Sequence, residues 1–197
     1  MFLIVLKNII TWKMGGKITI DSSTLCNKGL EVIEAKWLYD FPIERTKIIM
    51  HRESNVHSLL LLKDGSYIAD VSKPDMHNPI KWSLFEGKID YNVEHVKSLK
   101  GYKDFHFSKF DPSRYPCVEL CLEAYRNGGN ATAILNAANE VAVNAFIEGK
   151  IPYPAIQREI EVALRNVKYI QNPSLRDLLS TDALTRNYVK SHIERTY

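Results

Sequence analysis

The sequence predicts an α+β protein, with a central region of mixed sheet and helices, an extended linker and a C-terminal helical bundle. Three observations favour this class. The chain has 197 residues, 45% of them hydrophobic, which is enough to bury a core. Short runs rich in β-branched residues, separated by turn residues, occupy the first part. Further on, apolar residues recur at helical spacing. We expect a central region at residues 1–85, a linker at 86–111 and a helical domain at 112–197.

The first strand candidates lie near the N-terminus. The run MFLIVL is apolar but is interrupted at Lys7, so it is much shorter than the about 20 apolar residues of a membrane span. We interpret it either as a buried strand or as the exposed remnant of a larger element. Residues 17–21, KITID, alternate in a pattern that predicts a strand.

A helix is expected to follow this strand. It would begin at Ser22 or Ser23, because either hydroxyl can cap a helix N-terminus. Apolar residues at helical spacing predict its buried stripe, which consists of Cys26, Leu30, Ile33 and Trp37.

The rest of the central region reads as a strand, a hairpin and a short helix. Residues 46–51 predict a strand, and residues 56–72 predict a hairpin because Asp64-Gly65 separates two apolar runs. The short helix is expected to start near Pro79. No sustained period follows until residue 111, which is typical of a linker.

Four helices are predicted beyond the linker. The first begins at Pro116 and ends before Gly128-Gly129. The second has Asn130 as its cap and Gly149 as its stop. Helical periods at 154–167 and 182–195 predict two more, so the C-terminal part reads as a bundle.

Composition excludes several classes of protein. With 26 basic and 23 acidic residues the net charge is +3, and no concentrated basic run suggests nucleic acid as a partner. Neither a signal peptide nor a membrane span is recognisable, so we interpret the chain as cytoplasmic. Cys117 and Cys121 are four residues apart, so they could be a pair of metal ligands. The favoured interpretation is that they are small core residues.

The stretch DSSTLCNKGLE, residues 21–31, suggests a binding site. A helix N-terminus offers free N–H groups, and the side chains of Ser22, Ser23, Asn27 and Lys28 add donors for an anion such as phosphate. Glu31 follows one turn after Asn27 and supplies a carboxylate oxygen of the kind that binds a divalent cation.

An ordinary solvated helix start is the alternative. In that case the serines are caps and Lys28 pairs with Glu31 three residues on. Gly29 argues against it, because glycine inside a helix costs about 1 kcal/mol relative to alanine. A close backbone approach at Gly29 would explain its presence.

Three long motifs resemble one enzyme family. They are WKMGGKITIDSSTLCNKGLEVIEAKWL, HRESNVHSLLLLKDGSYIADVSKPDMHNPI and RYPCVELCLEAYRNGGNATAILNAANEVAVNAFIEGKI. Together they resemble the 1-deoxy-D-xylulose-5-phosphate reductoisomerases of non-mevalonate isoprenoid biosynthesis. The resemblance implies an oxidoreductase and isomerase that rearranges a sugar phosphate and reduces it with NADPH. It also implies Mg²⁺ or Mn²⁺ as the metal and a homodimer.

The resemblance assigns roles to individual residues of this sequence. It implies that Glu31 is a catalytic residue and metal ligand that also touches substrate, that Gly15 meets NADPH, and that Trp12 and Met14 belong to a flap over the substrate. The other substrate contacts that it implies are Ser22, Asn27, Lys28, Ser54, Pro74 and Met76.

Other polar residues are given structural roles. We expect His51 and His57 to make structural hydrogen bonds, and we assign no role to His77. The signature LNAANE contains Asn136, Asn139 and Glu140, which we interpret as buried polar struts that organise helix packing.

The sequence also departs from the family pattern. The Gly-rich NADPH loop, a substrate-binding lysine and two further acidic metal ligands are not found, and KNIITW stands where the family has His-Pro before TW. We therefore expect a truncated chain that is inactive alone. The alternatives are a split-enzyme subunit that needs a separate NADPH domain, or a non-catalytic phosphate-binding or interaction module.

Overall fold

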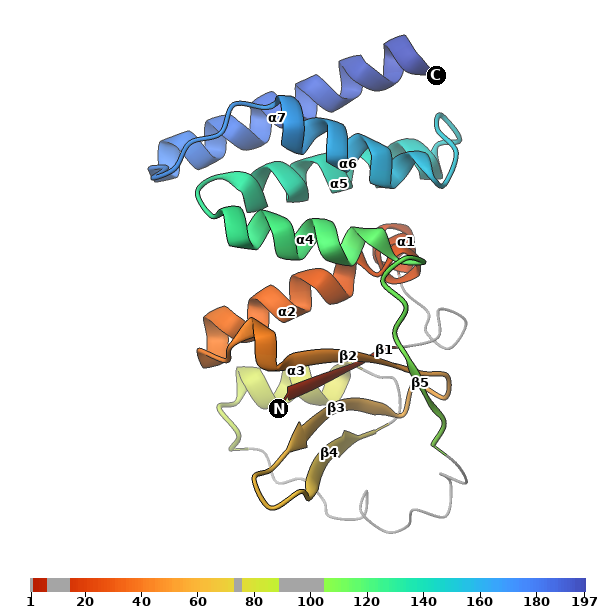
Figure 1. Cartoon of the computed structure of the whole chain (residues 1–197), viewed down its shortest axis with the longest axis vertical. Coiled ribbons are helices and arrows are strands. Elements are labelled where there is room, and N and C mark those ends of the chain that lie inside the picture. Colours follow the sequence, from red (N-terminus) through yellow and green to blue (C-terminus); the bar gives the residue numbers. More distant parts are fainter. Residues whose placement is uncertain (1, 7–14, 73–75, 89–104) are drawn as a thin grey trace. The chain divides into compact units, whose positions relative to one another are not determined.

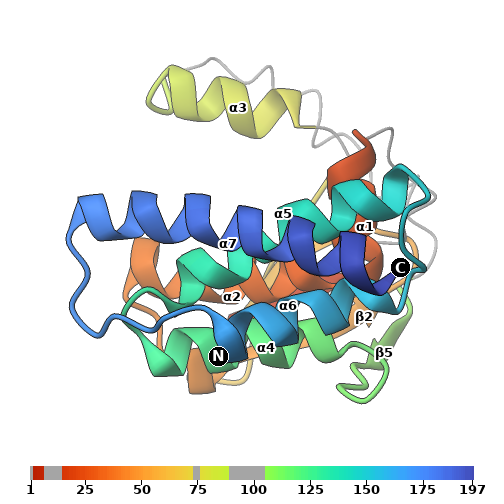
Figure 2. The same cartoon turned by 90° about the horizontal axis from the view of Figure 1, so that it is seen from above.

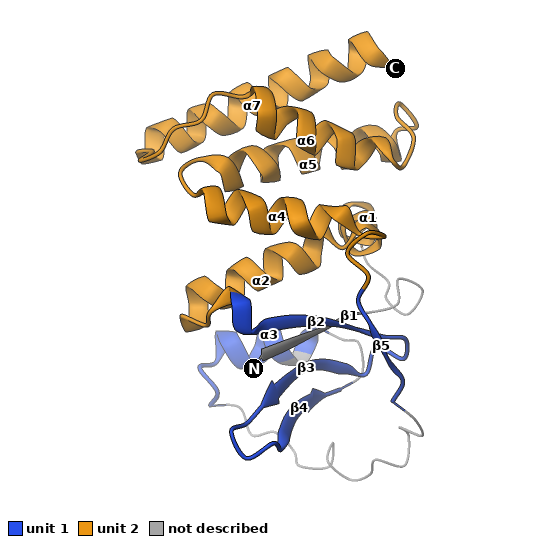
Figure 3. Ribbon diagram, in the orientation of Figure 1, with its two compact units in different colours: residues 1–13, 44–110 blue, residues 14–43, 111–197 orange. Residues whose placement is uncertain are grey.

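A computed structural model describes residues 2–6, 15–72, 76–88 and 105–197 (Figure 1). The chain divides into two compact units (Figure 3). Unit 1 comprises residues 1–13 and 44–110, and unit 2 comprises residues 14–43 and 111–197. In the described parts, no helix has the length and apolar character that a membrane crossing needs.

Unit 1 is built on a mixed five-stranded sheet with the strand order β4-β3-β1-β2-β5. Strand β1 lies in the middle, parallel to β2 and antiparallel to β3. The N-terminal apolar run is therefore a strand with a partner on each side, and the predicted strand at 46–51 is confirmed as β2. The strands are β1 (Phe2–Leu6), β2 (Thr46–His51), β3 (Val56–Leu61), β4 (Tyr67–Val71) and β5 (Phe107–Lys109).

The predicted hairpin is confirmed as the antiparallel pair β3–β4. Its turn is closed by a backbone hydrogen bond of 2.9 Å from Leu62 N to Ser66 O. Gly65 has a φ of +87°, which side chains other than glycine rarely tolerate. The Asp64 carboxylate accepts a hydrogen bond of 2.9 Å from Ser66 N. Local residues thus determine this turn.

Helix α3 (His77–Leu84) is the predicted short helix, and it begins two residues before Pro79. The predicted linker contains a strand that its sequence did not reveal. Residues 107–109 form β5, which pairs antiparallel with β2. Its three residues are exposed and too few to show a period.

Unit 2 is helical (Figure 2). Helix α5 contacts α1, α4, α6 and α7, and α2 packs on α4. Buried alanines along α5, among them Ala137, Ala138 and Ala142, allow these close approaches. The α+β class is confirmed. The helices of unit 2 are α1 (Gly16–Thr24), α2 (Cys26–Tyr39), α4 (Pro116–Asn127), α5 (Ala131–Ile147), α6 (Ala155–Asn166) and α7 (Leu175–Thr196). A short 3-10 helix, η2 (Ile43–Arg45), lies where the chain passes from unit 2 to unit 1.

The strand predicted at 17–21 is wrong, because these residues belong to helix α1. Their β preference is weak against tertiary contacts. In the helix, Lys17 and Asp21 lie on one face, and Nζ of Lys17 is 2.6 Å from Oδ2 of Asp21. Ser22 and Ser23 are therefore inside α1 and do not cap the next helix. Helix α2 begins at Cys26, after Leu25 at a φ of 59°.

The buried stripe predicted for α2 is correct at Cys26 and Ile33 and wrong at Trp37, which is 74% exposed. Leu30 is half-buried against the core. Trp37 lies two turns beyond Gly29, where α2 packs closely on α4, and its ring is edge-on to that of Tyr125 with the ring centroids 6.3 Å apart. A strict helical period therefore extends the buried face too far.

The compact units divide the chain differently from the boundaries expected at residues 85 and 112. Helices α1 and α2 pack with the C-terminal helices in unit 2. The physical cause is a shared core, in which the sulfur atoms of Cys26 and Cys121 lie 3.7 Å apart.

Candidate functional site

Asn27, Lys28 and Glu31 form a cluster at the start of α2. Nζ of Lys28 donates to both carboxylate oxygens of Glu31, at 2.8 Å to Oε1 and 2.6 Å to Oε2. Nδ2 of Asn27 donates to Oε1 at 2.7 Å. The Lys28 side chain is 8% exposed and that of Glu31 32%. Asn27 and Glu31, one turn apart in the sequence, thus lie on the same face of α2.

Within this cluster the lysine ammonium and the glutamate carboxylate neutralise each other. The pair is the one that the solvated-helix alternative predicted, so its presence does not separate that alternative from a binding site. The side-chain chemistry fits both the phosphate and the metal ion of a phosphorylated, metal-bound substrate. An amide and an ammonium bind phosphate, and a carboxylate oxygen binds a hard cation. Each partner of the pair competes with a ligand of the same charge for the other side chain.

Ser22 lies on α1, three residues before Leu25 at the corner between α1 and α2, and it is half-buried. The neighbouring hydroxyls are used within α1 itself. Oγ of Ser23 donates to Ile20 O at 2.7 Å, and Oγ1 of Thr24 donates to Asp21 O at 3.3 Å. The donors predicted at one helix mouth therefore come from two consecutive helices joined through Leu25.

The lack of a side chain at Gly29 makes room for a neighbouring helix. A Cβ added there would lie 2.6 Å from Cys121 Cβ, 2.7 Å from its sulfur and 3.3 Å from Val118 Cα. A close backbone approach at Gly29 is found, but the approaching group is helix α4, so Gly29 does not argue against the solvated-helix alternative.

The remaining predicted site residues are dispersed. Gly15 precedes α1 in unit 2 and is exposed, and its carbonyl accepts from Thr19 N at 3.2 Å. In unit 1, Ser54 is fully buried with a φ of 57°, and Met76 is 51% exposed at the start of α3. Three further predicted residues, Trp12, Met14 and Pro74, lie outside the described residues.

The two histidines expected to have structural roles do make structural hydrogen bonds. Nδ1 of His51 lies 3.1 Å from His106 O and 3.0 Å from Oε2 of Glu53, and its ring stacks on Phe107. Nε2 of His57 lies 3.0 Å from Ser72 O. Across the described ranges, no group of three or more His, Cys, Asp or Glu side chains is arranged to hold a metal ion.

The carboxylate of Glu53 also accepts from His106, whose Nδ1 lies 2.5 Å from Oε1. This hydrogen bond lowers the pKa of Glu53 from its usual 4.5 to about 2. The pair joins the end of β2 to the start of β5.

The three cysteines are free and buried. A hydrogen bond with Cys121, followed by burial, raises the pKa of Cys26 well above its usual value. Burial raises the pKa of Cys117 to about 12. Protonated thiols in a core are poor metal ligands and poor nucleophiles, which supports their interpretation as core residues.

The LNAANE signature supplies cross-helix contacts. Asn139 is fully buried and donates to Oδ1 of Asp21 at 2.8 Å. Glu140 is half-buried and accepts from Arg186 of α7 at 2.7 Å. The residue that the sequence missed is Asp21. Its separation of four from Lys17 was the available signal, and it is informative only when the segment is read as a helix.

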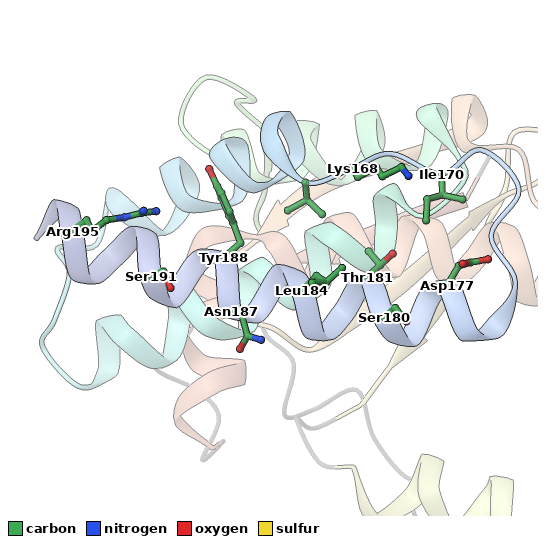
Figure 4. Close-up of a pocket in the computed structure, with 11 residues that line it drawn as sticks. Lys168, Ile170, Asp177, Ser180, Thr181, Leu184, Asn187, Tyr188, Ser191 and Arg195 are labelled. Atoms are coloured by element: carbon green, nitrogen blue, oxygen red, sulfur yellow. The ribbon is translucent and has the colours of Figure 1, made fainter.

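Elsewhere in unit 2, a cavity of about 470 Å³ lies between α7 and the segment after α6 (Figure 4). Lys168 and Ile170 line one side, and Leu184 and Tyr188 lie on α7. The predicted site residues are not among those that line it.

Comparison with known proteins gives the family. Residues 71–188 match the DXP reductoisomerase C-terminal domain, and residues 7–39 match the 1-deoxy-D-xylulose 5-phosphate reductoisomerase C-terminal domain. The 1-deoxy-D-xylulose 5-phosphate reductoisomerase of Geobacillus sp. (strain WCH70) is 44% identical over 181 residues, which are 91% of this chain and 48% of the relative. That of Caldanaerobacter subterraneus subsp. tengcongensis is 47% identical over 180 residues, 90% of this chain and 47% of the relative.

Solved structures agree with the sequence matches. The reductoisomerase of Zymomonas mobilis in complex with NADPH superimposes with a TM-score of 0.84 at 30% identity, covering 98% of this chain and 55% of that one. A DOX-P reductoisomerase in complex with NADPH, fosmidomycin and magnesium gives a TM-score of 0.85 at 29% identity, with coverage of 98% and 55%. The chain belongs to the 1-deoxy-D-xylulose 5-phosphate reductoisomerase family. It spans about half the length of the relatives that it matches.

Proposed function

We propose that this chain supplies the phosphate-binding part and one metal ligand of a reductoisomerase active site. The reaction is the NADPH- and metal-dependent conversion of 1-deoxy-D-xylulose 5-phosphate to 2-C-methyl-D-erythritol 4-phosphate, a step of isoprenoid biosynthesis. The observation that carries the proposal is the cluster of Asn27, Lys28 and Glu31 in a chain of this family.

In this proposal Lys28 and Asn27 bind the substrate phosphate, with Ser22 adding a hydroxyl from α1. Lys28 is 6% exposed, and an ammonium shielded from water attracts an anion more strongly than an exposed one does. Two contacts join its ammonium to Glu31, and the third N–H of the ammonium can be directed at the phosphate.

Glu31 would then hold Mg²⁺ or Mn²⁺ and contact the substrate. When bound, such an ion acts as a Lewis acid on the substrate oxygens. A carboxylate that is about one-third exposed suits this role, since it can keep one oxygen on the ion and remain open to the substrate. Support comes from the relative that is described as a complex with NADPH, fosmidomycin and magnesium.

The other roles implied by the family resemblance complete the proposal. The Gly15 backbone meets NADPH, and Trp12 and Met14 form a flap that excludes water from the substrate. Ser54, Pro74 and Met76 line the substrate-binding cavity of this active site, which is not the cavity beside α7. We also propose a homodimer in the cytoplasm, and sedimentation velocity of the purified chain tests the dimer.

We expect that the 197-residue chain by itself does not catalyse the reaction. Glu31 is the one carboxylate to which the resemblance assigns the metal, and a hard cation usually takes several oxygen ligands. NADPH oxidation that depends on substrate and Mn²⁺ would refute this expectation. A split enzyme predicts that activity returns when a separate NADPH domain, such as that of the Geobacillus relative, is added.

Binding tests the proposed site independently of turnover. 1-Deoxy-D-xylulose 5-phosphate should shift the amide resonances of Ser22, Asn27 and Lys28 in the ¹⁵N-labelled chain. Lys28→Gln should weaken this binding by about tenfold or more, because it removes a charge-assisted contact. Lys36→Gln is the matched control, since Lys36 lies on the same helix and pairs with Asp40.

The two variants separate the hypotheses. Equal binding by Lys28→Gln and Lys36→Gln would contradict the proposed site. A phosphate-binding module without catalysis would use Asn27 and Lys28 with no metal on Glu31, whose carboxylate is paired with Lys28. That module predicts that Mn²⁺ leaves the affinity for the sugar phosphate unchanged, whereas the enzyme site predicts tighter binding.

A further inference from the structure

Helix α1 has nine residues and is too short to be stable without partners. Its N-cap residue, Gly15, offers no side-chain hydrogen bond, and its buried residues are Asp21 and Thr24. Both are polar. Ile20 packs partly buried against the hydrophobic core, but the fully buried part of α1 is polar, so specific polar contacts help to fix its position.

Asp21 makes those contacts. It is 2% exposed, and both of its carboxylate oxygens have partners. Oδ2 is 2.6 Å from Nζ of Lys17 within α1, and Oδ1 accepts from Nδ2 of Asn139 at 2.8 Å. Because Asn139 is fully buried in α5, this hydrogen bond is shielded from water and directional, and losing it would leave a buried carboxylate short of a partner.

The start of α1 also lies close to α5. A Cβ on Gly16 would lie 3.4 Å from Cδ1 of Ile147, the last residue of α5. Helix α1 is thus packed along α5, with the hydrogen bond at Asp21 as its polar contact.

The corner after α1 transmits this placement to α2. Leu25 alone separates the two helices. Oγ1 of Thr24 donates to the Asp21 carbonyl and accepts from Cys26 N at 3.3 Å. The residue that Asn139 holds is therefore linked, through two hydrogen bonds, to the first residue of the helix that carries Asn27, Lys28 and Glu31.

We propose that Asn139 is a positioning residue, which holds α1 through Asp21 so that Ser22 and the Asn27–Lys28–Glu31 cluster can bind one phosphate together. This inference rests on the proposed function of that cluster. It adds that a residue of the C-terminal helical part, 118 positions from Asp21 in sequence, sets the affinity for the sugar phosphate.

Asn139→Asp tests the proposal, because it places a second carboxylate against Asp21. The swapped variant Asp21→Asn/Asn139→Asp restores an amide–carboxylate hydrogen bond with donor and acceptor exchanged. Glu140→Gln is the matched control: it weakens the neighbouring contact to Arg186 of α7 and leaves α1 untouched. If Asn139→Asp fails to fold, Asn139→Ala removes the donor without adding charge.

Two measurements are made on each variant of the full chain. The first is the dissociation constant for 1-deoxy-D-xylulose 5-phosphate. We expect it to rise by about tenfold or more in Asn139→Asp, since small displacements of binding groups are costly, to recover in the swapped variant and to change less than about twofold in Glu140→Gln. The second is amide hydrogen exchange at Cys26 and Gly29, which should accelerate in Asn139→Asp without ligand.

The outcomes of the two measurements distinguish a wrong positioning role from a wrong proposed function. Unchanged exchange at Cys26 and Gly29 in Asn139→Asp overturns the positioning role, as does an affinity that stays at the wild-type value while the free energy of unfolding falls. If the wild-type chain does not bind the sugar phosphate, the proposed function is wrong, and the exchange measurement still decides whether Asn139 positions the corner.

Discussion

Nζ of Lys28 lies 2.6 Å from Oε2 of Glu31 and 2.8 Å from Oε1. The side chain proposed to bind phosphate is therefore paired with the side chain proposed to bind the metal. Their separation of three residues on α2 makes this contact easy to form. The Glu31 carboxylate competes with phosphate for the Lys28 ammonium, and the ammonium competes with a cation for the carboxylate. The pair should therefore weaken the binding of either ligand by itself.

Glu31→Gln should strengthen the binding of inorganic phosphate in the absence of metal. Removing the carboxylate charge releases the Lys28 ammonium, and we expect the dissociation constant to fall by about threefold or more, in line with about 0.7 kcal/mol for a partly exposed ion pair. Phosphate titration followed by NMR measures it. Glu34→Gln, an exposed carboxylate on the same helix, should leave the affinity unchanged. Equal affinities in both variants would show that the pair does not restrain Lys28.

Gly29→Ala should destabilise the protein by up to about 2 kcal/mol. The added Cβ would lie 2.6 Å from Cys121 Cβ, and overpacking costs about 1–3 kcal/mol, offset by about 1 kcal/mol of helix propensity. Urea unfolding measures the change. Gly16→Ala is the control, because its Cβ meets Ile147 at an ordinary 3.4 Å. The close approach of α2 and α4 would be in doubt if both variants were equally stable.

Asn130→Ala should destabilise the protein by about 2–4 kcal/mol. The buried Asn130 side chain donates to Lys168 O and to Thr181 Oγ1, each at 3.0 Å, and accepts from Ile170 N at 2.9 Å. It joins the start of α5 to α7 and to the segment beside the cavity. Thermal or urea unfolding measures the loss, and Asn166→Ala, which removes one exposed contact, should cost less than about 0.5 kcal/mol.

Glu53 should titrate with a pKa of about 2 in the folded chain, because His106 donates to its carboxylate. Since the folded pKa is lower than the usual 4.5, this contact stabilises the fold above about pH 4.5 and is lost as the pH falls towards 2. Carboxyl ¹³C shifts measure the titration. His106→Gln should return the pKa towards 4.5; a value that stays near 2 in this variant would assign the shift to another group.

The sequence by itself determined the elements whose signals are local. The hairpin follows from Asp64 and Gly65, whose carboxylate and positive φ shape the turn. Helix α4 begins at Pro116, as its sequence predicted, and ends at Asn127 before Gly128. The cluster of Asn27, Lys28 and Glu31 was also predictable, because residues three and four apart on a helix must meet.

Only the tertiary structure decided the features that depend on distant residues. Residues 17–21 form a helix because Asp21 is buried against Asn139, and the weak β preference of the segment cannot oppose that contact. The Asn130 side chain does not cap α5, because its amide is hydrogen-bonded to Lys168, Ile170 and Thr181 instead. Helix α2 joins the C-terminal helices because Gly29 lies against Cys121. Such pairings are set by packing, which brings together residues that the sequence keeps far apart.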